Sequence, residues 1–198
     1  MKSVHTALGI IALSGTILGG FIAPSAIAQP ICSTDGDYEQ TASTTRTLAL
    51  REWGIAVEIP ENYRSMKRQD GAVMILHPDD FDMIQCIAQG GRGGHGYYAE
   101  TIELVPDDLS MDLREQARWT MGYGTNAQGD RVPVSERIIP YQKGRISGYI
   151  VTSQSGYGVS FLGTIPNQSR LLQVSASCDC DVDIESVTDL LESMTLLN

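Results

Sequence analysis

The sequence is poor in the residues that make most catalytic centres recognisable. Only three histidines are present, and two of them, His77 and His95, lie beyond the first 28 residues. No serine stands in the Gly-x-Ser-x-Gly pattern of many hydrolases, and the His-Glu-x-x-His pattern of zinc proteases is absent. Basic residues are also scarce, because 14 Lys and Arg stand against 24 Asp and Glu, for a formal net charge of −10. A surface of this sign repels phosphate backbones, so we expect no nucleic-acid partner.

A hydrophobic run long enough to span a membrane is also missing after the N-terminal segment. That segment starts with Lys2, continues through an uncharged, mostly apolar run at 7–21, and closes with Ala26-Ile27-Ala28. This order is typical of a signal peptide with an Ala-x-Ala cleavage site, and the run is shorter than the roughly 20 residues of a spanning helix. We therefore expect residues 1–28 to be removed. The mature chain would then be exported, to the periplasm, a thylakoid lumen or the extracellular space.

The rest of the chain predicts one domain behind a short leader. Residues 29–44 are rich in Ser, Thr, Asp, Gln and Gly and show little periodicity, which predicts a flexible lead-in. Residues 45–198 have the length of a single domain.

Four cysteines follow the signal segment: Cys32, Cys86, Cys178 and Cys180. An even number in an oxidising compartment suggests disulfides, and three pairings are possible. A bond between Cys178 and Cys180 would close a very small, strained ring. We therefore favour one bridge from Cys86 to this pair and a second from Cys32 to the body. The functional alternative is a redox or metal site; three or four thiolates could hold zinc, although the usual Cys-x2-Cys spacing is absent.

Short apolar runs separated by turn residues predict an α+β fold, with an antiparallel sheet packed against helices. The expected strands cover 47–50, 54–59, 65–69, 72–77, 83–88, 97–105, 132–141, 148–152, 158–165 and 171–177, and a helix is expected over 109–121. A second helix closes the chain, with an apolar stripe formed by Ile184, Val187, Leu190, Leu191, Met194 and Leu197. We expect this stripe to lie on the preceding sheet. Acidic residues precede it, and Asp183 is the expected N-cap, with a calcium site as the alternative.

A glycine cluster interrupts the middle of the chain. Its backbone amides could approach an anion, but a strand follows it where a phosphate loop needs a helix. We therefore interpret it as a mobile hairpin loop and, with the two tyrosines after it, as the candidate binding surface. The candidate residues are Gly91, Arg92, Gly93, Gly94, His95, Tyr97 and Tyr98.

The histidines allow a second interpretation. His77, with Asp79 and Asp80 close by in sequence, could form a metal site together with His95. No spacing typical of a metal site supports it, so we expect neither a metal nor any other cofactor.

Two stretches resemble PsbP-like domains. Gly54-Ile-Ala-Val-Glu-Ile-Pro-Glu-Asn-Tyr63 is similar to the opening of that family, where a strand runs into Pro-x-x-aromatic. The strand at 171–177, its polar link and a helix ending in Ser193-Met194 resemble the family's ending. The resemblance implies an antiparallel sheet between helices and an accessory or binding role. Several members are extrinsic subunits or assembly factors of photosystem II on the lumenal side of thylakoids.

The sequence therefore predicts a non-enzymatic, extracytoplasmic binding or accessory domain with a protein partner, of the kind found on photosynthetic membrane complexes. The alternative is a small secreted hydrolase or metal-binding protein that uses His77, His95 and nearby Asp residues. The sequence does not indicate an oligomeric state.

Overall fold

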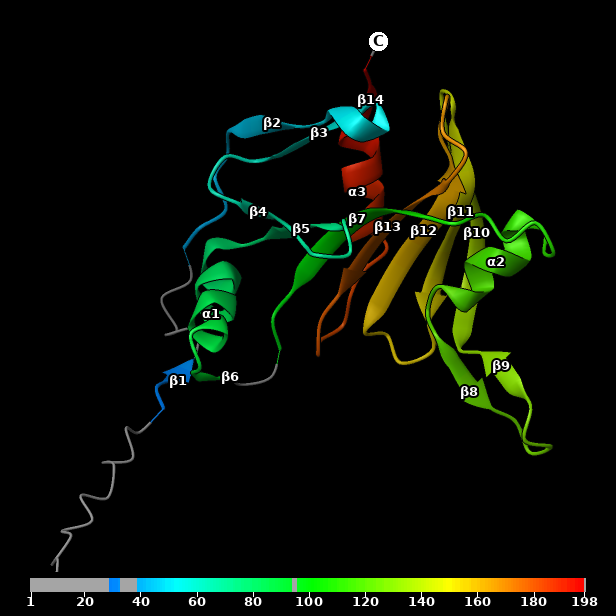
Figure 1. Cartoon of the computed structure of the whole chain (residues 1–198), viewed down its shortest axis with the longest axis horizontal. Coiled ribbons are helices and arrows are strands. Elements are labelled where there is room, and N and C mark those ends of the chain that lie inside the picture. Colours follow the sequence, from blue (N-terminus) through cyan, green and yellow to red (C-terminus); the bar gives the residue numbers. More distant parts are fainter. Residues whose placement is uncertain (1–28, 33–38, 94–95, 198) are drawn as a thin grey trace, which may run out of the picture.

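A seven-stranded antiparallel sheet forms the centre of the molecule (Figure 1). The computed structural model describes residues 29–32, 39–93 and 96–197. The strands of this sheet, in spatial order, are β10 (Ser135–Lys143), β11 (Ile146–Ser153), β12 (Gly158–Thr164), β13 (Leu171–Ser177), β7 (Ala99–Val105), β5 (Val73–Leu76) and β4 (Arg64–Lys67). Short connections join β10 to β13 as a meander, which is why consecutive strands pair antiparallel.

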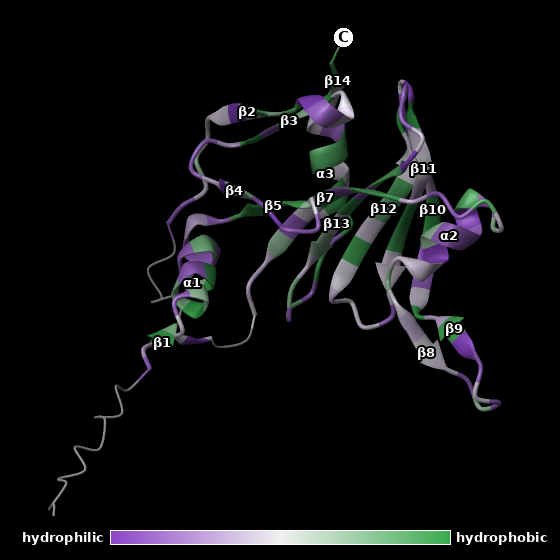
Figure 2. Ribbon diagram, viewed as in Figure 1, coloured by the Kyte–Doolittle hydropathy of each residue, from purple (hydrophilic) through white to green (hydrophobic). Residues whose placement is uncertain are grey.

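A second, three-stranded sheet lies over one face of the large sheet (Figure 1). It consists of β2 (Thr45–Leu50), β3 (Ile55–Pro60) and β14 (Thr195–Leu196), with the 3-10 turn η1 (Arg51–Trp53) between β2 and β3. Helix α3 (Glu185–Ser193) packs between this sheet and the inner face of the large one. Figure 2 shows the hydrophobic colour along the large sheet and on α3 where these layers meet.

The main core fills the space between these layers, because alternate residues of each strand point inward. Its fully buried side chains include Ile55, Val57, Ile75, Ile102, Phe161, Leu172 and Leu191. Gly148 and Gly163 oppose each other across β11 and β12, and a Cβ on either would meet the Phe161 ring. The two glycines therefore make room for the largest fully buried side chain of the core.

The opposite face of the large sheet carries helices α1 (Pro78–Ala88) and α2 (Leu113–Trp119). Ala117 of α2 packs with Val151 and Leu162, and Phe81 and Ile84 of α1 pack on Met74 and Leu76. The predicted α+β architecture, an antiparallel sheet packed against helices, is confirmed.

The terminal helix lies on the sheet as predicted, with Val187, Leu190, Leu191 and Met194 buried. Its ends differ from the prediction. Ile184, not Asp183, is the N-cap, and it makes no side-chain cap. The helix stops at Ser193, and the chain then pairs with β3 as β14.

The expected strand over 83–88 is wrong, because these residues form the second half of α1. Pro78 occupies the first turn, where its missing N–H costs nothing, and Asp79 and Asp80 suit the positive end of the helix. A short apolar run fits a strand or a buried helix equally well, so periodicity alone misassigned it.

The helix expected over 109–121 is shorter than predicted, because α2 covers only Leu113–Trp119. It begins after Asp112, whose carboxylate accepts the Glu115 N–H at 2.8 Å, while Asp108 caps a turn at Ser110 instead. The strand expected over 132–141 is divided: β9 (Arg131–Pro133) pairs with β8 (Tyr123–Thr125), and β10 joins the large sheet.

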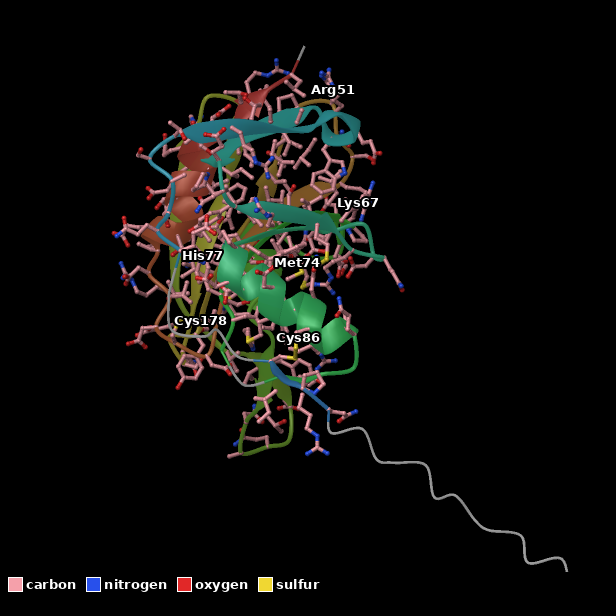
Figure 3. All side chains as sticks on the ribbon, turned by 90° about the vertical axis from the view of Figure 1, so that its left-hand side faces the viewer. Arg51, Lys67, Met74, His77, Cys86 and Cys178 are labelled. Atoms are coloured by element: carbon pink, nitrogen blue, oxygen red, sulfur yellow. A yellow bond between two sulfur atoms is a disulfide. The ribbon has the colours of Figure 1, made fainter. Side chains whose placement is uncertain are left out.

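All four cysteines are oxidised, but the favoured pairing is wrong. Cys32 is bonded to Cys86, and Cys178 to Cys180. Cys86 lies in the last turn of α1, on the face of the sheet away from α3 and its leading loop, so it meets the N-terminal segment and not the Cys178 pair. Figure 3 labels Cys86 on helix α1 and Cys178 at a position of its own.

Among the described residues, no helix has both the length and the apolar character to cross a membrane. The proposed signal segment, residues 1–28, lies outside the described residues.

Candidate functional site

The described part of the predicted glycine loop lies against the N-terminal segment and its disulfide. Gly91 packs directly on the Cys32–Cys86 disulfide, where a Cβ would collide with both sulfurs. Strand β6 (Arg92–Gly93) pairs in parallel with β1 (Ile31–Cys32), so this part is a docking point for the N-terminal segment. Gly94 and His95 lie outside the described residues. The interpretation as a simple hairpin loop is therefore corrected for the Arg92–Gly93 portion.

The two tyrosines of the predicted surface point to different places. Tyr97 is 40% exposed and lines a hollow beside Cys178. Tyr98 is half-buried and packs against the main core, and its hydroxyl donates to Glu100 Oε1 at 2.9 Å.

His77, which Figure 3 labels, lies with Asp79 at the start of α1, where the two side chains contact the N-terminal segment at Glu39. His77 Nε2 lies 2.7 Å from the Glu39 carbonyl oxygen, and Asp79 Oδ2 accepts the Glu39 N–H at 3.1 Å. His77 Nδ1 is 3.1 Å from Asp79 Oδ2. Both ring nitrogens of His77 thus make polar contacts within the protein. Within the described ranges, no group of three or more His, Cys, Asp or Glu could hold a metal ion, and His95 falls outside them.

A cleft of about 450 Å³ lies where β3, the start of β7 and the first half of α3 converge. Five carboxylates line it, and no Lys or Arg does so among the described residues: Glu58, Glu100, Asp183, Glu185 and Asp189. Tyr63 and Tyr98 supply two aromatic walls. We call this feature the acidic cleft.

Glu100 is the unusual member of the acidic cleft. It stands in the core-facing row of β7, in register with the buried residues Ala176 and Ile75 on the neighbouring strands. Burial raises its pKa from 4.5 to about 7; the hydrogen bond from Tyr98 acts in the opposite direction, and the negative charge of Asp189 raises it further. A carboxyl group at this position is half ionised near neutral pH.

Tyr98 is fixed from both sides. Burial raises the pKa of its phenol above the usual range, and the Glu100 charge adds to this, so the hydroxyl remains a donor. The Asp80 carboxylate lies buried at the start of α1 and accepts the backbone N–H of Tyr98; burial raises the Asp80 pKa, and the nearby His77 lowers it. Tyr98, in the segment just before β7, is therefore held between Glu100 and the start of α1.

Sequence reasoning identified Tyr98 but not the acidic cleft. Glu58, Glu100 and Asp189 are far apart in sequence, and only the crossing of β3, β7 and α3 brings them together. One signal was available: Glu100 interrupts an apolar strand on the same side as Ile102 and Leu104.

Comparisons with known proteins assign no family. A scan against protein-family models found no match, and neither did a search of curated proteins. Among solved structures, the Ran-binding protein Mog1p of Saccharomyces cerevisiae is similar to this chain with 8% sequence identity and a TM-score of 0.43. The alignment covers 78% of this chain and 96% of that one. The PsbP-like resemblance stays a prediction at the level of family, while the α+β architecture that it implies is present.

Proposed function

We propose that this protein is an exported, non-enzymatic accessory domain that binds a basic segment of a protein partner in the acidic cleft. The observation that carries the proposal is the position of Glu100, a carboxyl group in the core-facing row of β7 at the base of a carboxylate-lined cleft. A lysine or arginine side chain entering the cleft would meet opposite charge, and water screens that charge least beside the desolvated Glu100.

The aromatic walls suit the same ligand. A guanidinium or ammonium group is attracted to the face of a tyrosine ring, and Tyr63 and Tyr98 line the acidic cleft together with the carboxylates. The net charge of −10 would steer a basic partner toward the protein from a distance.

Export belongs to this proposal. The N-terminal 28 residues have the composition of a signal peptide, and the two disulfides formed by all four cysteines suit an oxidising compartment. The compartment is the periplasm, a thylakoid lumen or the extracellular space. The family resemblance favours a partner in a photosynthetic membrane complex.

Isothermal titration calorimetry with a short Arg- and Lys-containing peptide tests the proposal. A cation beside Glu100 favours its ionised form, so binding near pH 7 should release a fraction of a proton, and the apparent enthalpy should depend on the ionisation enthalpy of the buffer. Glu100→Gln should abolish this buffer dependence. A Glu-containing peptide of equal length should not bind.

A paired substitution locates the binding surface. Glu185→Gln with Asp189→Asn removes two cleft carboxylates and should weaken peptide binding by roughly tenfold at low salt. The matched control is Glu136→Gln, an exposed carboxylate on β10 near the far edge of the sheet. Equal loss in the cleft variant and the control would contradict the proposal. So would capture of the same native partner, from the exported fraction, by wild type and cleft variant alike.

A further inference from the structure

The Cys178–Cys180 disulfide joins no two separate parts of the fold. The β12–β13 ladder ends at the pair Gly158–Ser177, and both cysteines follow it in the connection toward α3. Only Asp179 separates them, whereas 54 positions separate Cys32 from Cys86. Because the restriction that a disulfide imposes on the unfolded chain grows as the three-halves power of loop length, the two bridges differ roughly a hundredfold in this effect. The short bridge therefore contributes little to holding the chain together.

The two sulfurs of this disulfide differ in access and in surroundings. Cys180 is exposed, while Cys178 is buried, with 9% of its surface exposed. The backbone N–H of Cys180 donates to Cys178 Sγ at 3.0 Å, and the Cys180 carbonyl oxygen lies 3.2 Å from the same sulfur. A donor in this position stabilises negative charge on the Cys178 sulfur, as forms when the disulfide opens.

A hollow of about 210 Å³ adjoins the disulfide. Its lining includes Cys178, Asp179, Ser177 and, from the segment before β7, Gly96 and Tyr97. Tyr97 is one of the few large apolar side chains exposed among the described residues, at 40%. An incoming peptide could bind in this hollow, beside the exposed sulfur of Cys180.

We propose that Cys178–Cys180 is an exchangeable disulfide that oxidises a dithiol of an exported protein. A thiolate of the client attacks Cys180 Sγ, the accessible sulfur, and forms a mixed disulfide with it. The Cys178–Cys180 bond breaks, and Cys178 leaves as a thiolate that takes a proton from water.

The second client thiol, deprotonated, then attacks the client sulfur of the mixed disulfide and releases Cys180 as a thiolate, which is protonated in turn. Two electrons and two protons pass from the client dithiol to Cys178 and Cys180. The reaction is stoichiometric, with one client disulfide formed per protein, and it does not depend on the acidic cleft.

A glutathione redox titration of the purified, disulfide-bonded protein tests the proposal without any substitution. Differential alkylation followed by peptide mass spectrometry reports the two bridges separately. Cys178–Cys180 should be half reduced at a concentration of reduced glutathione at least about tenfold lower than Cys32–Cys86 requires, because its Cys180 sulfur is exposed and the bridge closes a short loop. Simultaneous reduction of the two bridges, or earlier reduction of Cys32–Cys86, would overturn the proposal.

Transfer is measured with a synthetic peptide that carries two cysteines, under anaerobic conditions. Wild type should form close to one peptide disulfide per protein. Cys178→Ser with Cys180→Ser should form none, with circular dichroism confirming that this variant is folded. Peptide oxidation that survives the double substitution would refute the assignment.

Two single variants test which sulfur is attacked. Cys178→Ser leaves the exposed thiol and Cys180→Ser leaves the buried one, so oxidised glutathione should form an adduct with the first at least about tenfold faster. Equal rates, or a faster reaction of the Cys180→Ser variant, would contradict the proposed order of steps.

Discussion

Glu100 makes the stability of this protein depend on pH in a direction opposite to that of most carboxylates. Its pKa rises from 4.5 in an unfolded chain to about 7 in the fold, chiefly because the group is buried. Between these values the folded protein holds a proton at Glu100 that the unfolded chain has lost. The free energy of unfolding therefore falls as the pH rises through this window, and the loss is complete above pH 7.

The magnitude follows from the pKa rise. A rise of about 2.5 corresponds to between 3 and 4 kcal/mol, at roughly 1.4 kcal/mol for each pKa unit. This figure is an upper bound, since the mouth of the acidic cleft admits water. Glu100→Gln keeps the shape and the acceptor for Tyr98 but carries no charge. We expect the variant to be more stable than wild type by at most roughly 3 to 4 kcal/mol at pH 8.5.

The assay is urea unfolding followed by circular dichroism, without reductant, at pH 4, 5.5, 7 and 8.5. Taking the difference between variant and wild type at each pH cancels the contributions of the other carboxylates. Near pH 4 both states hold the proton at residue 100, so the difference should be within about 0.5 kcal/mol. The control Glu136→Gln should show no trend. A difference that is constant across the range, or one that destabilises at pH 8.5, would refute the account of Glu100.

Three further predictions concern stability. Cys32→Ser with Cys86→Ser removes the bridge between the N-terminal segment and α1, and should lower the free energy of unfolding by about 4 kcal/mol in urea titrations. Lys143 donates to the last carbonyls of α3, so Lys143→Met should cost about 1 kcal/mol by the same assay, while Lys143→Arg should recover part of it. Gly163→Val forces a side chain against Phe161 and the neighbouring backbone, and thermal melts should show a loss of more than about 3 kcal/mol; an unchanged melting temperature would contradict the packing described for this site.

Local patterns in the sequence determined the frame of this protein. The apolar stripe of the last helix and the alternating strands from Gly148 to Ser177 are contiguous, so each element carries its own periodicity. The short turns between these strands require antiparallel neighbours. Helix α1 is where the prediction from sequence was wrong, because a strand was expected over 83–88. Its residues contain one short apolar run, whose composition also suits a strand. The helix-start signal, Pro78 followed by Asp79 and Asp80, favours a helix more strongly than that composition favours a strand.

Only the tertiary structure determined which cysteines pair and which residues form the acidic cleft. The cysteine pairing depends on which face of the sheet each segment reaches, and α1 carries Cys86 to the face opposite α3. Spacing along the chain contains no information about that choice. The acidic cleft likewise combines residues from β3, β7 and α3. These elements exclude water from Glu100, and this desolvation raises its pKa. Sequence order records which groups are present, whereas desolvation arises only when distant segments close around them.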